Sequence, residues 1–487
     1  MNRRLIVAAG ICLMLAACAT VPKDRGTSQV NDLLKSRSTI AAEVGFNTNA
    51  DISELLMQPL DADAAVRVAL NRNAHMQSLY AQLGLAQAEV YDASRLSNPT
   101  LGFLRLTADE GARTTWTLTQ SFTELLFISY RTRVGRSQAL QAQQQIAQSV
   151  LDLEARVRSA YYQYVAATLI ARLHEQGNLA ARVSADYAKS LFDAGNISEL
   201  QLSREQAAAS RAHIEWQAAL SKSQHQQGEL LTLMGLSFGK APEFIERLEV
   251  PAAQALESAS LQAWAQQQRV DLAMLREQVA IHDSMQAHAR RWFWLSDPQL
   301  QLEQEHETDG TRLRGAGGSV GIPLFNQGKG ARLRAQAQLE TTQAELSALQ
   351  LSISNDVVVQ LDSLQRARQI VEEYRQRLVP VQERMLALTQ QQHNYMLIGA
   401  FELLNARREV LQTYQEYLDA TGEYWLQYVA LAKTVGGRLP DAAGDAAVGI
   451  SVGVDALPPT ESEAALHAGD DEHAKHSHAD MKSGDAP

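Results

Sequence analysis

The feature of this 487-residue chain that most constrains its fold is a structural pattern that occurs twice. Each copy predicts a short helix, an Asx-Pro pair, two alternating strands, a very long helix, a glycine-marked tip and a shorter helix. Asn98-Pro99 and Gly195 mark the first copy, and Asp297-Pro298 and Gly399 mark the second, so the offsets are 199 and 204 residues. Such a repeat predicts two similar half-units, and it argues against an enzyme and for a conduit.

The N-terminus has the pattern of a bacterial lipoprotein signal. Asn2-Arg3-Arg4 is basic, and Leu5 to Ala17 is an apolar stretch too short to span a bilayer as a helix. Leu15-Ala16-Ala17-Cys18 then resembles a lipobox, so cleavage is predicted to leave a covalent lipid on Cys18. One lipid-modified terminus anchors a protein without spanning the membrane. An ordinary secretory signal with a chance cysteine is the alternative.

Cysteine content and net charge exclude several kinds of site. Cys12 leaves with the signal and Cys18 is the predicted lipid site, so no thiol remains for a disulfide, a redox pair or a thiolate metal site. The net charge is −11, which argues against a nucleic-acid partner. From Asp441 onward, ten acidic residues stand against two lysines, so most of this charge belongs to the C-terminal tail.

Two segments predict helices far longer than those of ordinary globular proteins. Residues 130–191 and 329–395 correspond to roughly 93 and 100 Å of helix at 1.5 Å per residue. Such helices need lateral partners along their whole length, which shorter helices at 61–94, 198–233, 258–292 and 400–435 can supply. Each long segment carries a heptad-like apolar seam: Ile146, Val150, Leu153, Val157, Ala160 and Tyr164 in the first, and Leu346, Leu349, Ile353, Val357, Leu361 and Leu364 in the second.

Both long helices contain a residue that weakens a helix. They are Gly177 in the first and Pro380 in the second, and they lie at similar places because subtracting the tip offset of 204 from 380 gives 176. A glycine loosens a helix and a proline kinks it. The functional interpretation is a shared bend at which the helices curve inward. Two unrelated breakers are the alternative.

Each long helix is preceded by a predicted pair of strands of about ten residues, a length typical of outer-membrane strands. In the first pair, over 100–107 and 114–123, Trp116, Leu118 and Phe122 alternate with polar residues. The second pair shows the same alternation at Leu300, Leu302, Val320, Ile322 and Leu324. Ordinary half-buried hairpins share this pattern. If the strands lie in a membrane, four of them cannot close a barrel, and twelve strands from three chains would remove the costly open edges.

Over residues 60–436 the chain resembles the TolC-type outer-membrane efflux factors, in their lipoprotein branch. Residues 321–328 (GIPLFNQG) are similar to the family's strand-to-helix signature, and residues 399–406 (GAFELLNA) are similar to its tip. The resemblance implies a mainly α fold with membrane β: a homotrimer whose twelve-stranded β-barrel, four strands per chain, continues into a long periplasmic α-helical barrel. It also implies a passive exit duct, with no enzymatic activity, that is linked by a periplasmic adaptor (membrane fusion) protein to an inner-membrane pump of the RND type.

The resemblance further implies gate and contact residues. The family's Asp-x-x-Asp gating pair corresponds to Glu402 and Asn405, of which only Glu402 keeps a carboxylate, and Asp193 near the first tip is a weaker candidate. A solvated glutamate on a helix face is the alternative for Glu402. The tips, Gly195-Asn196 and Ile398-Gly399, are the expected contacts of the adaptor, by docking between helices.

The tail, 437–487, is rich in Gly, Ala, Asp and Pro and is predicted to be disordered. His473, His476 and His478 near its end can converge on a transition-metal ion, which would indicate a metal efflux system. A solvated acidic tail that happens to contain histidines is the alternative.

The predicted organisation is a signal peptide (1–17), an N-terminal linker (18–60), a first repeat (61–240), an equatorial linker (241–257), a second repeat (258–436) and the tail. The predicted function is the passage of small toxic solutes, with transition-metal cations among the candidates, from the periplasm through the outer membrane to the exterior. A duct for type I secretion and a periplasmic helical scaffold or metal-binding lipoprotein are the alternatives.

Overall fold

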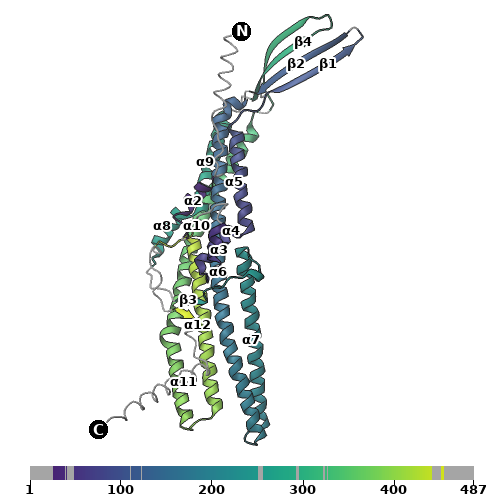
Figure 1. Cartoon of the computed structure of the whole chain (residues 1–487). Helices are drawn as coiled ribbons and strands as arrows, with labels where there is room; N and C mark the ends of the chain where they lie inside the picture. Colours follow the sequence, from purple (N-terminus) through teal and green to yellow (C-terminus); the bar gives the residue numbers. More distant parts are fainter. Residues whose placement is uncertain are drawn as a thin grey trace, which may run out of the picture.

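The protein is an elongated, mainly helical molecule with a small antiparallel sheet at one end and two helical tips at the other (Figure 1). This computed structural model describes residues 26–38, 40, 49–109, 111–121, 123–249, 256–291, 296–321, 324–325, 327–440 and 451–453. The predicted lipid site at Cys18 and the predicted metal ligands His473, His476 and His478 lie outside the described residues.

The two-fold repetition is confirmed in the order of the elements. The first half contains α4 (Ala62–Arg72), α5 (Ala74–Ala93), β1 (Thr100–Ala108), β2 (Gly111–Ser121), α6 (Thr123–Asp193) and α7 (Glu199–Met234). The second half contains α8 (Ser258–Gln268), α9 (Val270–Arg291), β4 (Ser296–His306), β5 (Arg312–Gly321), α10 (Lys329–Glu373), a π-helical turn η2 (Tyr374–Leu378), α11 (Val379–Asn394) and α12 (Ala400–Thr434).

The predicted single helices at 61–94 and 258–292 are each two helices, broken at one residue. Asn73 and Arg269 take nearly the same extended conformation, with φ/ψ of −65°/119° and −65°/125°. Asn73 donates a hydrogen bond to the carbonyl of Leu233, and Arg269 donates one to the carbonyl of Thr434, both at 2.9 Å. Each break therefore places a donor against the unsatisfied last carbonyls of the returning helix of its own half.

The long helices form the spine of the molecule, and their predicted seams lie in the core. The seam of α6 is buried throughout, and that of α10 is buried from Ile353 onward. With 71 residues, α6 is roughly 105 Å long, and it starts seven residues earlier than predicted because β2 ends at Ser121. It packs against α4, α5, α7, α9 and α12, which are the lateral partners that its length requires.

The second long helix is interrupted where the first is continuous. The π turn η2 precedes Pro380, and the N–H of Val379 reaches back five residues to the carbonyl of Tyr374. A proline cannot donate to the carbonyl four residues before it, so the extra residue of a π turn accommodates the missing bond. By contrast, α6 passes Gly177 without a break.

Two segments outside the predicted repeats carry structure. The N-terminal linker contains α2 (Thr27–Leu34) and α3 (Asn49–Leu55), and Val30 of α2 is fully buried. The chain from 437 onward is not wholly disordered, because Leu439 is 1% exposed and the short strand β6 (Ser451–Gly453) pairs with β3 (Arg247–Glu249). Gly437, shortly after the end of α12, has φ 119°. A Cβ there would lie 2.3 Å from the carbonyl oxygen of Arg37, so the close approach of these two segments requires a glycine.

Candidate functional site

The four long strands form one antiparallel sheet in the order β1-β2-β4-β5, so the two halves of the chain meet at the β2–β4 pair. The sheet projects beyond the ends of α5 and α9 (Figure 1). The strands confirm the predicted pairs, with one correction: β4 begins at Ser296, before Asp297-Pro298, and its pairing with β5 is irregular between Ser296 and Gln299. A proline removes a ladder hydrogen bond, so it is tolerated at such a bulge.

One face of the sheet is apolar and open. Leu101 is opposite Leu118, Leu118 is opposite Leu302, and Leu302 is opposite Ala316, so a single row of aliphatic side chains crosses all four strands. In the next row, the rings of Phe103 and Trp116 lie 4.6 Å apart. We call this surface the apolar band; its large members, all 40–66% exposed, are Leu101, Phe103, Trp116, Leu118, Leu300, Leu302 and Val320. Contiguous exposed apolar surface on a sheet marks a contact with lipid or protein.

The opposite face is mainly polar. Thr117 is opposite Glu303 and Thr115 is opposite Glu305, which also forms an ion pair with Arg113. Leu104, Leu106 and Leu313 interrupt this face, and Leu324 lies beyond the end of β5 rather than in it. Phe122 and Ile322 fall outside the described residues. In the described part of the chain, β1 and β5 are the edges of the sheet and have no second partner strand.

The two tips, where the long helices end, have the same backbone geometry. The N–H of Asn196 donates to the carbonyl of Leu191 at 2.8 Å, and the N–H of Leu397 donates to that of Gln392 at 3.0 Å. The left-handed residue of each tip is Gly195, at φ 76°, or Met396, at φ 59°. The structure therefore aligns the tips with an offset of 201 residues.

This alignment corrects the predicted offset of 204. Gly399 is the N-cap of α12 and corresponds to Ser198, the N-cap of α7, and both have φ near −80°. Pro380 consequently corresponds to Leu179 rather than to Gly177, so these two residues do not form an equivalent pair of bends. The prediction failed because it assumed that a glycine must occupy the left-handed position, whereas Met396 takes that conformation in the second tip.

The two tip glycines should respond differently to substitution. We expect Gly195→Ala to lower the free energy of unfolding by about 1–2 kcal/mol, because a Cβ is disfavoured in the left-handed region. Gly399→Ser should not lower it, since φ is negative there, a Cβ has open space, and serine is a preferred N-cap residue, as Ser198 is at the equivalent position. Thermal unfolding of both variants beside the unmodified protein measures this difference, and equal effects would contradict the alignment.

The predicted gate residues are exposed near the tips and are not brought together within one chain. Glu402 and Asn405 lie one turn apart on α12, and Arg408 donates to the Oδ1 of Asn405 at 3.3 Å. Asp193 forms an ion pair with Lys189 in its own helix at 2.9 Å. The predicted contact residues Asn196 and Ile398 lie in the tip turns, where Tyr395, Met396 and Leu397 present a strongly exposed apolar surface.

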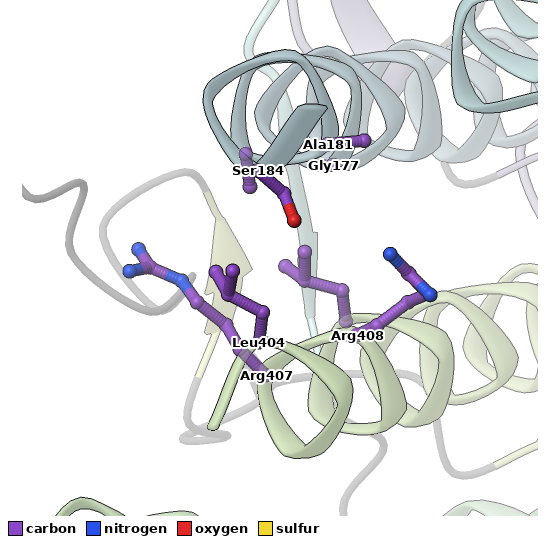
Figure 2. Close-up of a pocket in the computed structure, with 8 residues that line it drawn as sticks. Gly177, Ala181, Ser184, Leu404, Arg407 and Arg408 are labelled. Carbon is purple, nitrogen blue, oxygen red and sulfur yellow. The ribbon is translucent and has the colours of Figure 1, made fainter. Parts of the chain in front are cut away.

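Side chains that the sequence did not single out line the contact between α6 and α12 near the tips. In Figure 2, Leu404 of α12 points toward Ser184 of α6, with Arg407 and Arg408 on either side of it. Farther from the tip, an open groove of about 810 Å³ runs between α6, α7 and α12. Asp419 lines this groove with Lys222 and His174; burial raises the pKa of its carboxyl, and the charge of Lys222 opposes this shift.

The end of η2 and α11 together expose a further apolar seam. Leu378, Val381, Met385 and Leu388 follow the 3-4-3 spacing of a heptad, and all four are exposed. The other side of α11 faces α12, where the hydroxyl of Tyr414 donates to Glu383 at 2.5 Å. A heptad seam is stable when a second helix covers it, and within the described part of the chain no helix does so.

Among the described residues, no group of three or more histidine, cysteine, aspartate or glutamate side chains is placed to hold a metal ion. The described helices also include none that is both long and apolar enough to cross a membrane.

Comparison with known proteins rests on structure. No family model and no curated protein sequence matches the chain. Among solved structures, it is similar to the Campylobacter jejuni CmeC outer membrane channel, with a TM-score of 0.66 and 14% identity over 81% of this chain and 89% of that one. It is also similar to VceC, an outer membrane protein of Vibrio cholerae (TM-score 0.63, 15% identity, 77% and 96% covered), and to CusC (TM-score 0.61, 14% identity, 82% and 98% covered).

These likenesses extend along nearly the whole length of the relatives and over about four-fifths of this chain. The identities are low, so what the comparison establishes is the arrangement of the chain. It confirms the fold to which the sequence signatures pointed. The chain has the fold of the TolC-type outer-membrane channels.

Proposed function

We propose that this chain is the outer-membrane exit duct of a tripartite efflux pump and that it acts as a homotrimer. The observation that carries the proposal is the apolar band on a sheet whose two edge strands are open. An open strand edge is prohibitively costly in lipid, so a sheet that faces lipid must close with other copies. Three copies would supply the twelve strands of a barrel, with the polar face turned to the lumen.

The exposed seam of α11 supports the same assembly. Four apolar side chains at heptad spacing on a helix that already packs against α12 require a second helical partner. In a closed ring, the neighbouring copy supplies that helix at every subunit, so sheet closure and helix packing are satisfied together. The helices then line a continuous tunnel that leads from the tips to the barrel.

The partners and the cargo extend this proposal. The exposed apolar tips, with Met396 92% exposed, are suited to contact a periplasmic adaptor, which would connect the duct to an inner-membrane pump of the RND type. Cys18 would carry the lipid that adds an anchor to the barrel. The cargo would be small toxic solutes, and the histidines of the tail add transition-metal cations to the candidates.

Assembly and conductance test the proposal. The full chain, extracted from membranes with detergent, should have the mass of three protomers in light scattering after correction for bound detergent. In planar bilayers it should form ion-conducting pores. A Cys18→Ala variant that is released from membranes as a monomer without detergent would contradict the proposal, because only a scaffold would depend on the lipid alone for its attachment.

For the metal cargo, deletion of 454–487 should increase the sensitivity of a cell to transition metals, and unchanged sensitivity would remove metals from the proposal.

A further inference from the structure

Four helix ends meet beside the sheet. The ring of Tyr130, near the start of α6, stacks on His288, near the end of α9, with centroids 4.1 Å apart. α9 is joined to α10 by a hydrogen bond between His282 and Thr342 at 2.9 Å, and α5 packs against α6. The start of α6, the end of α9 and the start of α10 thus lie at one level of the molecule, next to the strands (Figure 1).

Exposed cations are concentrated at this level. We call them the basic collar: Arg133 and Arg136 on α6, Arg290 and Arg291 on α9, and Lys329 and Arg334 on α10. The segments that contribute them, 129–137, 288–291 and 329–334, contain no aspartate or glutamate, although the whole chain has 55 acidic residues against 44 basic ones. The N-terminus of α10, which starts at Lys329, adds the partial positive charge of its unpaired backbone N–H groups.

Glu89 and Asp92 of α5 lie near the collar, beside Gly135, but the described residues form no ion pair with it. None of its six members forms an ion pair with a carboxylate in the described part of the chain, whereas exposed arginines elsewhere do, as Arg366 does with Asp362 at 2.6 Å and Arg377 with Glu373 at 3.2 Å. Six unpaired cations at one level repel one another, so an external anionic partner would lower their electrostatic free energy.

Exposed apolar side chains lie beside these charges. Phe325 is fully exposed and Leu324 is 69% exposed in the segment between β5 and α10, and Leu333 is exposed between the cations of α10. Arginine and lysine mixed with aromatic and aliphatic side chains are typical of protein surface at the boundary between headgroups and acyl chains. The apolar band starts on the strands that precede these helices in the chain, and Val320, at the end of the band, is four residues before Leu324.

We propose that the basic collar binds the phosphate headgroups of anionic phospholipids in the leaflet that faces the helical part of the protein. This inference rests on the proposed membrane insertion of the sheet, and it adds a lipid specificity that insertion by itself does not require. The guanidinium groups would contact phosphate oxygens, and Leu324 and Phe325 would enter the adjacent acyl region. The contact would also fix the depth at which the sheet sits in the bilayer.

The test compares lipid retention by the full chain in detergent. The protein is delipidated, mixed with micelles that contain phosphatidylglycerol or phosphatidylcholine, and analysed by native mass spectrometry for lipid that stays bound. We expect retention of phosphatidylglycerol several-fold above phosphatidylcholine, with the difference reduced at 0.5 M salt. The collar variant Arg290→Gln/Arg291→Gln/Arg334→Gln should lose at least about three-quarters of this preference.

A matched control removes three exposed arginines from the helices near the tips, Arg182→Gln/Arg204→Gln/Arg384→Gln, and should keep the preference. Equal retention of the two lipids by the unmodified protein would overturn the proposal, as would an equal loss in the control variant. A collar variant with unchanged lipid preference but altered anion-to-cation conductance would also overturn it, because it would place the cations in the lumen. Trimer mass and conductance, measured on the same samples, report separately on the proposed duct.

Discussion

Leu118→Arg is expected to abolish stable assembly of the protein in membranes. Leu118 lies at the centre of the apolar band, between Leu101 and Leu302 in adjacent strands. An arginine on the lipid face of a membrane strand costs about 2–4 kcal/mol near the bilayer midplane, so three copies would cost roughly 6–12 kcal/mol per trimer. Detergent extraction followed by light scattering should show loss of the trimer, and planar bilayers should show loss of conductance.

The neighbouring residue supplies the control. Thr117 precedes Leu118 on the same strand, faces the opposite side of the sheet and is paired with Glu303. Thr117→Arg would place the same charge beside a carboxylate on the polar face, so the trimer should persist and only the conductance should change. If Thr117→Arg were as damaging as Leu118→Arg, or if Leu118→Arg were tolerated, the assignment of the lipid-facing side would be wrong.

Arg158→Met is expected to lower the free energy of unfolding by about 3–5 kcal/mol, because it would leave a buried carboxylate without its cation. Arg158 of α6 contacts Glu154 at 3.1 Å and Asp63 of α4 at 2.7 Å, and Glu154 also accepts a hydrogen bond from Ser38 at 2.8 Å. The side chain of Glu154 is 7% exposed. Burial opposes the charge of Arg158, but Glu154 and Asp63 outweigh it and raise the pKa of the guanidinium.

The double variant Arg158→Met/Glu154→Gln separates loss of charge pairing from loss of packing. It removes the buried negative charge and keeps a side chain of similar size at 154, so about half or more of the lost stability should return. Urea unfolding of the detergent-solubilised protein, followed by circular dichroism, measures the midpoints of the single and double variants. No recovery in the double variant would show that the aliphatic part of Arg158, and not its charge, stabilises the junction of α4 and α6.

Patterns that repeat within a few residues could be read from the chain alone. The seams of α6 and α10 were predictable because a buried helix face recurs every three to four residues, and Ile146 and Val357 are both at the core as expected. The apolar face of the strands was predictable in the same way, from alternation at Trp116 and Leu118. The length of the helices followed from the absence of breakers between Pro99 and Pro242.

Features that depend on a distant partner could not be read in this way. The helix breaks at Asn73 and Arg269 occur where each side chain reaches a carbonyl 160 or more residues away, and neither residue is a strong breaker. Met396 takes a left-handed conformation that its residue type disfavours, because the second tip repeats the hydrogen bonds of the first. In the tail predicted to be disordered, the described residues 451–453 form β6 for the same reason, since β3 supplies their partner strand.

The sequence by itself determined the type, the length and the apolar face of the repeated elements, because helix and strand periodicity are local properties of a chain. It also indicated, through two short signatures, the TolC-type fold that the comparison with known structures confirms. Only the tertiary structure decided the β2–β4 pairing that joins the halves, the groove between α6, α7 and α12, and the basic collar. Each of these three features consists of residues from separate helices or strands. Such residues lie close together because of long-range packing, and no local pattern in the sequence encodes that packing.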